Sequence, residues 1–367
     1  METYNLCCPC LFGLESLVSD ELKRMSMKDV RAESGRVFFS GSARDVARAN
    51  ISLRCAERVY IVMAAFPAST FDELFEGVKA APWEELVPRD GAVAVGGHSL
   101  KSRLSSVPAC QKIVKKSISD RLCAAYKTSW LSETGARFRV TISLMNDFAH
   151  ILLDTSGDGL HKRGYRAEAG GAPIRETLAA GIVKLSRYRG RGAFFDPFCG
   201  SGTILIEAAM IARARAPGLL RRFGAESWAH IPARVWKDVR DEARAGEFSN
   251  EYVIEGSDID AKALVTARSN AKKAGVSDIV RFFEADARRF SRESGVVAAN
   301  PPYGERMLDV REARELTAAF GKAAAGSGAS FYIISSDDEF ELYFGRRAVK
   351  KRKMYNGMIK CDLYMYF

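Results

Sequence analysis

The sequence predicts an α/β fold for the C-terminal part of the chain, preceded by an α+β half, and three observations support this prediction. An apolar strand that ends in Asp196 runs through a glycine turn into an apolar helix. Two later strand-like runs end in Asp258 and Asp286, and a fourth run, 295–299, ends at Asn300. Ligands of parallel α/β sheets bind at the carboxyl ends of the strands, so these four strand ends are expected to line one edge of a sheet.

The first of these strand ends continues as a glycine turn, Asp196-Pro197-Phe198-Cys199-Gly200-Ser201-Gly202. Gly200 and Gly202 have no side chains to keep a ligand away from the backbone, and the following helix offers unpaired N–H groups at its start. Dinucleotide and nucleotide folds use similar turns. A phosphate-binding P-loop requires a lysine after Gly202. Thr203 and Ile204 stand there instead, which argues against an NTPase.

The fourth strand end reads Asn300-Pro301-Pro302-Tyr303. Two successive prolines fix their own φ angles and lack N–H donors, which leaves the Asn300 amide and the Pro301 carbonyl as fixed acceptors. Together with the flat face of Tyr303, these acceptors suit a planar base that carries an exocyclic amino group. An isolated Asn-Pro-Pro is more often a structural turn that caps a strand. Its pairing with the glycine turn upstream favours the base-binding interpretation.

The two loops together resemble the class I S-adenosylmethionine-dependent amino methyltransferases. More narrowly, the segments 160–166 (LHKRGYR), 173–180 (PIRETLAA) and 353–357 (KMYNG) resemble the bacterial THUMP-domain 23S rRNA guanine-N2 methyltransferases, the group that includes the YpsC-like proteins. The likeness covers nearly the whole chain and is strongest from about Leu152 onward. It implies a Rossmann-like class I methyltransferase domain at 159–367, C-terminal to an RNA-binding half made of a ferredoxin-like domain (1–66) and a THUMP domain (67–158).

The resemblance implies S-adenosylmethionine as the cofactor. Asp258 stands one βα unit beyond the glycine turn, where it is expected to accept the ribose hydroxyls, and Asp286 is expected to accept the adenine amino group. In the family, the segment around Glu176 and Thr177 lies near the methionine end; a plain helix cap is the alternative for it. The expected cofactor-binding residues are Glu176, Thr177, Asp196, Pro197, Phe198, Cys199, Gly200, Ser201, Gly202, Asp258, Ile259, Asp286, Ala287 and Asn300. The expected catalytic residues are Asn300, Pro301, Pro302 and Tyr303.

The activity implied is methyl transfer to the exocyclic N2 of a guanine in RNA, with 23S rRNA as the expected partner. The residues alone support only the amino group of a base. A DNA adenine-N6 or cytosine-N4 methyltransferase, a tRNA guanine-N2 methyltransferase and a non-catalytic RNA-binding factor therefore stay open. The N-terminal half has no evident helix-turn-helix, which argues against DNA. A dehydrogenase would explain the glycine turn and Asp258 but not the Asn300 loop.

Composition agrees with a polyanionic partner. The 55 Lys and Arg exceed the 45 Asp and Glu, giving a net charge of +10. No apolar run is long enough to span a bilayer and no signal sequence is evident, so a cytoplasmic protein without membrane contact is expected. The eight cysteines are scattered, which predicts reduced thiols. No metal is expected, since Cys7 and Cys10 lack a second ligand pair. Cys199 is expected to be a small packing residue, and the oligomeric state is left open.

The N-terminal half shows alternating strand and helix patterns. Strands at 4–6, 36–39 and 58–64 with helices at 13–22 and 42–50 predict the ferredoxin-like domain. A helix at 70–78 that opens on a capping Ser or Thr, a strand at 92–97, a helix at 106–126 and strands at 137–142 and 150–155 follow. Two interpretations of the basic helix 106–126 are weighted equally: it contacts RNA phosphates, or it presents an ordinary solvated face. The segment 161–163 is read as a charged linker with a modest leaning towards RNA.

The C-terminal half contains an insertion after the glycine-turn helix. Its Trp228 and Trp236 are expected to fix the insertion to the core rather than to stack on bases. Asn356-Gly357 predicts a hairpin turn before the last strand. The basic run 350–353 before it holds a phosphate or only protects a sheet edge from aggregation.

Overall fold

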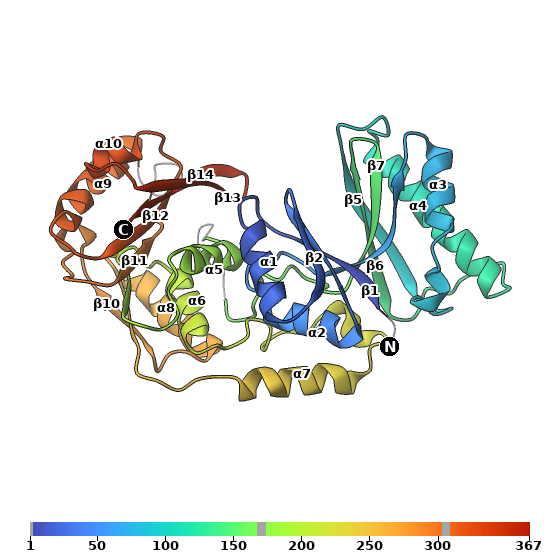
Figure 1. Cartoon of the computed structure of the whole chain (residues 1–367), viewed down its shortest axis with the longest axis horizontal. Coiled ribbons are helices and arrows are strands. Elements are labelled where there is room, and N and C mark those ends of the chain that lie inside the picture. The colour runs from blue at the N-terminus through green and yellow to red at the C-terminus, as the bar shows by residue number, and fades with distance from the viewer. Residues whose placement is uncertain (1–2, 167–173, 303–308) are drawn as a thin grey trace.

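The protein forms two seven-stranded sheets that lie along one long axis (Figure 1). This computed structural model describes residues 3–166, 174–302 and 309–367. Strands β1 to β7 build the N-terminal sheet and β8 to β14 build the C-terminal sheet. No helix in these three ranges is long and apolar enough to cross a membrane.

The N-terminal sheet has the strand order β2-β3-β1-β4-β7-β6-β5. Its strands are β1 (Tyr4–Pro9), β2 (Lys28–Glu33), β3 (Arg36–Gly41), β4 (Tyr60–Pro67), β5 (Ala92–Leu100), β6 (Arg137–Met145) and β7 (Phe148–Asp154). Its helices are α1 (Glu15–Arg24), α2 (Ala43–Ser52), α3 (Phe71–Lys79), η1 (Trp83–Glu85) and α4 (Val107–Ala125). The predicted elements are confirmed, and β2 is additional. It has no apolar alternation because it is an exposed edge strand, so the sequence pattern did not indicate it.

Strand β4 belongs to both N-terminal domains. On one side it pairs antiparallel with β1, where Leu6 lies opposite Ile61. On the other side it pairs antiparallel with β7, where Phe66 lies opposite Ala149. The two domains therefore share one continuous hydrogen-bonded sheet. The helix that follows β4 begins as expected, because Thr70 and Glu73 form a capping box at the start of α3.

The C-terminal sheet has the order β10-β9-β8-β11-β12-β14-β13. Its strands are β8 (Ala193–Asp196), β9 (Val253–Asp258), β10 (Val280–Glu284), β11 (Val296–Ala299), β12 (Ser330–Ser335), β13 (Lys350–Asn356) and β14 (Ile359–Tyr366). Its helices are α5 (Glu176–Leu185), α6 (Thr203–Ala212), η2 (Gly224–Ser227), α7 (Ala233–Ala245), α8 (Ala261–Ala274), η3 (Ala287–Arg289), α9 (Val310–Ala324) and α10 (Phe340–Phe344). Strands β8 to β12 pair in parallel, and β14 inserts antiparallel between β12 and β13. The predicted hairpin is confirmed, with Gly357 at φ +70° in its turn.

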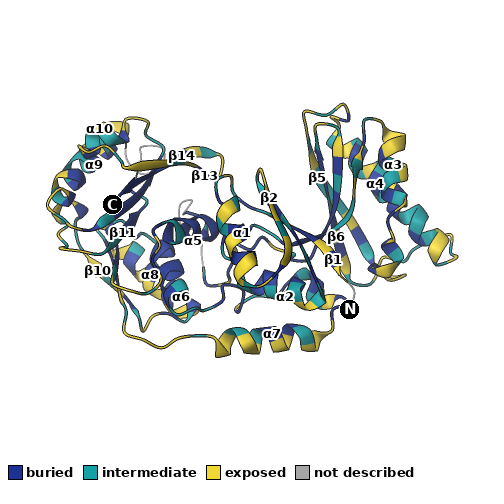
Figure 2. Cartoon of the chain, in the orientation of Figure 1, coloured by how far each residue is buried: buried dark blue, intermediate teal, exposed yellow. Residues whose placement is uncertain are grey.

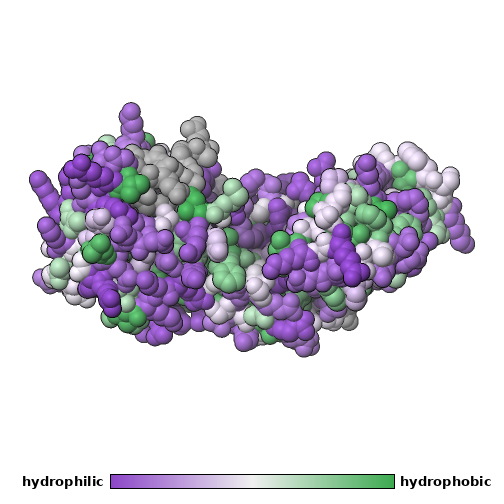
Figure 3. All heavy atoms as spheres, turned by 90° about the horizontal axis from the view of Figure 1, so that it is seen from above, coloured by the Kyte–Doolittle hydropathy of each residue, from purple (hydrophilic) through white to green (hydrophobic). Residues whose placement is uncertain are grey.

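Helix α6 is buried along almost its whole length, because its residues other than Thr203 and Glu207 are apolar and it packs beneath the sheet (Figure 2). The inserted helix α7 is largely exposed and packs against α2 of the N-terminal half. Trp228 stacks on Phe138 at 4.8 Å between ring centroids, and Trp236 stacks on Phe223 at 5.4 Å. Both tryptophans are buried, which confirms that they fix the insertion to the core. The face seen in Figure 3 is mostly hydrophilic, with hydrophobic residues in separate small groups.

Candidate active site

The C-terminal sheet changes direction between β8 and β11. From β8 the chain moves outward through β9 to β10, and then returns to β11 on the opposite side of β8. The parallel register sets Phe195 beside Val297 and Asp196 beside Gly256. Ligands of open α/β sheets bind in the crevice at such a switch point. The glycine turn after β8 and the Asn300 loop after β11 border this crevice.

The glycine turn adopts a backbone that its glycines permit. Gly200 and Gly202 have φ values of +48° and +81°, in the left-handed region that side chains disfavour. A Cβ atom at Gly200 would meet nothing within 4 Å, so open space lies beside the backbone there. At Gly202 it would lie 3.1 Å from the Ala267 Cβ and from the Phe282 ring. The turn thus offers an open approach at Gly200 and close packing at Gly202.

Asp196 lies at the base of the turn with 2% of its surface exposed. Its carboxylate accepts a hydrogen bond from the Phe198 N–H at 3.0 Å. Burial raises the pKa of Asp196 to about 8. The Cys199 thiol is also buried, which raises its pKa well above the ordinary thiol value. Cys199 is therefore a packing residue in the turn and not an activated nucleophile.

The remaining members of the turn are held by neighbouring elements. Pro197 is buried, and Phe198 packs edge-on against Phe320 with 5.1 Å between ring centroids. The Ser201 hydroxyl lies 3.3 Å from that of Thr203. Asn270, which the sequence pattern did not bring forward, donates from its side chain to the Ser201 carbonyl at 3.0 Å. The sequence feature that could have indicated Asn270 is an asparagine at a position on the apolar side of helix α8.

Asp258 ties the second acidic strand end to the glycine turn. Its Oδ2 accepts from the Gly200 N–H at 2.8 Å and its Oδ1 from the Asp260 N–H at 3.0 Å. Each oxygen keeps a second lone pair for a ligand hydroxyl. The neighbouring Ile259 is 65% exposed and offers an apolar surface at the mouth of the crevice. Asp260 caps helix α8, since its side chain accepts a hydrogen bond from the Lys262 N–H.

Asp286 starts the short helix η3 and is engaged by its own loop. Its Oδ1 accepts from the Arg288 N–H at 2.9 Å, and the Arg288 Nε lies 3.0 Å from Oδ1 and 2.8 Å from Oδ2. These bonds lower the pKa of Asp286. Ala287 is buried beneath it. The carboxylate thus has a protein partner on both oxygens, and a contact with adenine would have to share them with Arg288.

Asn300 follows directly after β11 in the crevice. Its Oδ1 is buried and has no hydrogen-bond partner among the described residues. Such an atom costs about 1–3 kcal/mol unless a donor reaches it. Pro301 is buried and Pro302 half-buried, while Tyr303 falls outside the described residues. The loop therefore presents an acceptor that a donor of a bound molecule can engage.

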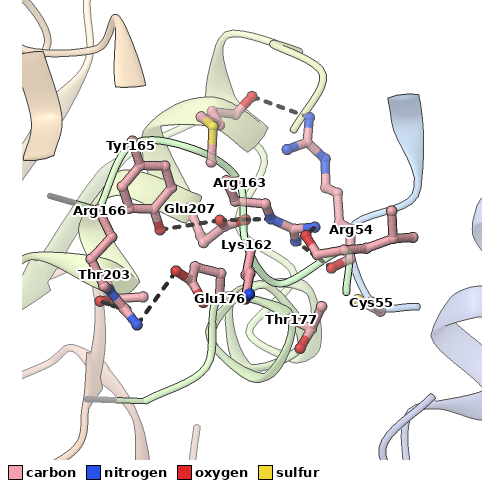
Figure 4. Close-up of polar contacts among 12 residues, drawn as sticks. Arg54, Cys55, Lys162, Arg163, Tyr165, Arg166, Glu176, Thr177, Thr203 and Glu207 are labelled. Carbon is pink, nitrogen blue, oxygen red and sulfur yellow. Dashed lines mark hydrogen bonds and ion pairs between the residues drawn. The ribbon is translucent and has the colours of Figure 1, made fainter. Parts of the chain in front are cut away.

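A second group of polar side chains meets at the starts of α5 and α6 (Figure 4). Glu176 is 3% exposed and pairs with Arg166 at 3.4 Å, while its Oε2 has no hydrogen-bond partner in the described ranges. Arg166 also donates to the Thr203 hydroxyl at 2.9 Å. Thr177 is buried beside Glu176, but its hydroxyl donates to Glu57 of the N-terminal half. The side chain of Thr177 thus joins α5 to that half, whereas Glu176 keeps one acceptor atom without a partner among the described residues.

The linker interpretation of 161–163 is wrong for Arg163. This side chain is 2% exposed, and its Nε lies 3.3 Å from Oε1 of the fully buried Glu207 in α6. Arg163 also donates to the backbone carbonyls of Leu160 and Arg54. Because the Arg163 side chain is buried, it cannot contact RNA. Its ion pair with Glu207 connects the segment that enters the catalytic domain with α6 (Figure 4). Lys162 next to it is exposed and pairs with Asp158.

Three family models match successive parts of the chain. The model described as the RlmL ferredoxin-like domain matches residues 5–60, the THUMP domain matches 68–154, and the RMKL-like methyltransferase domain matches 163–365. "Putative RNA methyltransferase YpsC" of Bacillus subtilis is 42% identical over 373 residues, covering 100% of this chain and 97% of that protein. Ribosomal RNA large subunit methyltransferase K/L of Syntrophotalea carbinolica is 35% identical and covers 96% of this chain, which spans 52% of that longer protein.

Solved structures with the same fold extend over the whole chain. A protein from Listeria monocytogenes, described as a predicted N6-adenine-specific DNA methylase, has a TM-score of 0.95 at 44% identity, covering 100% of this chain and 97% of that one. SMU.472 in complex with SAH has a TM-score of 0.94 at 40% identity, covering 100% and 98%. TrmN from Thermus thermophilus shares the fold alone, with a TM-score of 0.71 at 20% identity and 99% of each chain covered. The chain therefore belongs to the RMKL-like methyltransferase family, with the RlmL ferredoxin-like and THUMP domains ahead of the catalytic fold.

Proposed function

We propose that this protein transfers a methyl group from S-adenosylmethionine to the exocyclic N2 of a guanine in RNA, and that the RNA is large-subunit ribosomal RNA. The observation that carries the proposal is the buried, unpartnered Asn300 Oδ1 at the switch point of the sheet. An amino group on a planar base supplies the missing donor. The family relationship and the name of the K/L relatives support RNA as the substrate class and ribosomal RNA in particular.

The residues present fit the cofactor. The open space at Gly200 admits a ligand against the backbone, and the free Glu176 Oε2 accepts a hydrogen bond from the amino group of a methionine moiety. Asp258 holds the ribose hydroxyls with its remaining lone pairs, beside the apolar Ile259. Pro197, Phe198, Cys199 and Ser201 shape the turn, and Asp286 with Ala287 closes the adenine end. The cofactor supplies an electrophilic methyl group bonded to a sulfonium sulfur. This sulfur becomes a neutral thioether when the methyl group leaves.

Asn300 and Pro301 act on the target amine. The Asn300 Oδ1 and the Pro301 carbonyl accept its two hydrogens, which turns the nitrogen lone pair out of the ring plane and towards the methyl group. A bond forms between this nitrogen and the methyl carbon as the carbon–sulfur bond breaks, and positive charge develops on the nitrogen. The methylated nitrogen then releases one of its two protons to solvent and becomes neutral. Both oxygens stabilise this charge, and they do so more strongly in the transition state than in the ground state. Pro302 fixes the loop, and Tyr303 is assigned the face on which the base stacks.

The alternative substrate with a specific observation behind it is DNA. The Listeria neighbour carries the name of a predicted N6-adenine-specific DNA methylase, and the same two acceptors suit adenine N6 or cytosine N4. The THUMP match favours RNA over DNA. A tRNA guanine uses the same amine geometry, so the loop chemistry does not distinguish it from a ribosomal guanine.

Mass mapping of modified nucleosides separates these substrates. In a strain that lacks the gene, we expect N2-methylguanosine to disappear from one position of large-subunit RNA and to return when the wild-type gene is restored. The same strain with an Asn300→Ala copy should stay unmethylated. Loss of the mark from tRNA instead, or loss of N6-methyladenine or N4-methylcytosine from DNA, would replace ribosomal RNA as the substrate. An unchanged nucleoside profile in all three would overturn the proposed activity.

A further inference from the structure

A large groove in the described part of the molecule lies at the opposite edge of the catalytic sheet from the active site. Its volume is about 1160 Å³, more than the roughly 300–1,000 Å³ of a typical small-molecule site. It is lined by the loop that enters β8, by the ends of α5 and α6, by α1 and by the outer strands β13 and β14. The segments that lead into the amino ends of β8 and β9 open into it. A chain of phosphates fits this space better than a single metabolite.

The groove is strongly cationic. Its lining includes Arg24, Arg187, Arg189, Arg191, Lys350 and Arg352. None of these six forms an ion pair with any residue that the structure describes, and Asp20 is the acidic residue of the lining. Cations without local counter-charges raise the potential of a concave surface and attract polyanions. The basic run before the last strand contributes two of them, which favours its phosphate-binding interpretation over edge protection.

Two buried donors of the lining have no partner. The Tyr188 hydroxyl is buried, with the whole residue 3% exposed, and has no hydrogen-bond partner among the described residues. The same holds for Nη1 of Arg54, whose Nη2 donates to the carbonyls of Met210 and Arg215. Burial raises the pKa of Tyr188 to about 12, which keeps its hydroxyl a neutral donor. Two unsatisfied donors beside unpaired cations call for an acceptor-rich ligand such as phosphate.

Exposed aromatic side chains line the groove together with the cations. Phe248 is 60% exposed and Phe367 is 67% exposed, and both line the groove. The Phe367 ring lies nearly parallel to Tyr332, with an interplanar angle of 18°. A positively charged groove with exposed aromatic faces is the general design for single strands, because each base can stack while the backbone follows the charges. Paired bases in a duplex have no free faces to offer these rings.

We infer that this groove binds a single-stranded segment of the RNA substrate outside the methylated nucleotide. The inference rests on RNA being the substrate. Strand β8 has 4 residues and spans about 13 Å, which separates Arg191 at its start from the glycine turn at its end. The groove therefore holds flanking nucleotides and leaves the crevice free for the target base.

The test measures binding of a labelled oligouridine of roughly 12 nucleotides to the full chain by fluorescence anisotropy, across a range of salt. The variant Arg189→Gln/Arg191→Gln/Lys350→Gln removes three exposed charges. We expect its Kd to rise about tenfold or more and the slope of log K against log salt to fall by about 2, since each phosphate contact on a single strand contributes about 0.7. The matched control Lys262→Gln/Lys272→Gln/Lys273→Gln removes three exposed lysines of α8 and should leave both quantities unchanged.

The stacking component has its own pair of variants. Phe248→Ala should weaken oligouridine binding by about 5- to 100-fold and leave the salt slope unchanged. Leu342→Ala removes a side chain that is 71% exposed elsewhere and should have no effect. Equal losses in the two charge variants would mean general electrostatics, and an RNA duplex that binds more tightly than oligouridine would overturn the single-stranded assignment.

Methylation assays distinguish failure of this inference from failure of the proposed function. If the wild type methylates ribosomal RNA and the groove variant does so with unchanged KM, the groove inference alone is wrong. If the wild type binds oligouridine through the groove but methylates no RNA, the proposed function is wrong.

Discussion

The two edges of the catalytic sheet differ in chemistry. At the carboxyl edge, Asp196, Asp258 and Asn300 present acceptors, several of them held by backbone N–H groups of the loops. At the amino edge, Arg189 and Arg191 stand among unpaired cations and exposed aromatic rings. The first edge suits hydroxyl and amino groups of small, defined geometry, and the second suits a repeating anion. The residues proposed for methyl transfer and those proposed for RNA binding thus lie at opposite edges of one sheet.

Helix α6 connects the two edges. It begins at the glycine turn, runs for 10 residues from Thr203 to Ala212, and its last residues line the cationic groove. Glu207 in its middle is fully buried, and its pKa is raised by burial although Arg163 opposes that shift. Both edges therefore depend on the packing of helix α6. We expect the largest effect from a change at its buried ion pair and smaller effects from changes at each edge.

The largest effect is expected from Arg163→Met, which should lower the free energy of unfolding by about 3–5 kcal/mol because it leaves Glu207 buried beside one fewer cation. Thermal unfolding followed by circular dichroism measures this loss. Adding Glu207→Leu to the same chain should recover much of the stability, since the uncompensated charge is removed. The neighbouring exposed Lys162→Met should change stability by less than about 0.5 kcal/mol. A loss as large in Lys162→Met would contradict the role assigned to the buried pair.

At the carboxyl edge, Asn300→Ala should lower kcat about 100-fold, because the acceptor acts mainly on charge that develops in the transition state. Calorimetry should find the affinity for S-adenosylmethionine within a few-fold of wild type. Combining Asn300→Ala with the groove variant should multiply the two losses in kcat/KM, since the sites are distant and share no partner. Single-turnover methylation at the wild-type rate by folded Asn300→Ala would reduce Asn300 to a strand cap.

The protonation of Asp196 predicts a pH dependence at the same edge. Its pKa is about 8 in the folded protein, above the ordinary value of 3.8, so the folded state binds more protons than the unfolded state between these values. This contribution to stability is complete below about pH 4 and is lost as the pH rises towards 8, by about 1.4 kcal/mol per pH unit at most. Hydrogen exchange of the β8 amides at several pH values reports the local opening free energy. In the wild type the local opening free energy should fall between pH 5 and 8, and in Asp196→Asn it should stay constant over this range. If the opening free energy has the same slope against pH in both proteins, Asp196 is ionised in the folded state.

The smallest effect is expected from Gly200→Ala, which should cost about 1 kcal/mol of stability because φ is +48° there, and should weaken cofactor binding. Gly357→Ala is a matched control, since Gly357 has φ +70° in the hairpin turn and a Cβ there also meets nothing within 4 Å. The two variants should lose similar stability, measured by thermal unfolding. Only Gly200→Ala should lose affinity for S-adenosylmethionine, and equal affinity in the two would remove Gly200 from the site.

Sequence reasoning found the parts of this molecule whose local pattern and role coincide. The glycine turn and the Asn300 loop were readable because special backbone conformations require special residues. Arg163 was misread because nothing local distinguishes a linker charge from one whose buried partner, Glu207, lies in a later helix. Thr177 is expected near the cofactor, and its hydroxyl also bonds to Glu57 of another domain, a contact that no local pattern indicates.

The cationic groove was missed for a related reason. The run Arg187-Tyr188-Arg189-Gly190-Arg191 interleaves cations with an aromatic residue, which is a readable signal, but its partners come from both ends of the chain. Arg24 belongs to the first helix of the N-terminal half and Lys350 to the penultimate strand. Only the packing of the two halves brings them to one surface.

The shared strand β4 makes the N-terminal half one continuous unit. Since β4 pairs with β1 through Leu6 and with β7 through Phe66, the two domains meet in a hydrogen-bonded ladder and not at a hinge. The position of the THUMP strands relative to the ferredoxin-like strands is then set by the register of this ladder. An insertion of one residue in β4 would turn its side chains to the opposite face and misplace the THUMP domain as a whole. Any exchange of THUMP domains between relatives must therefore keep the register of this strand.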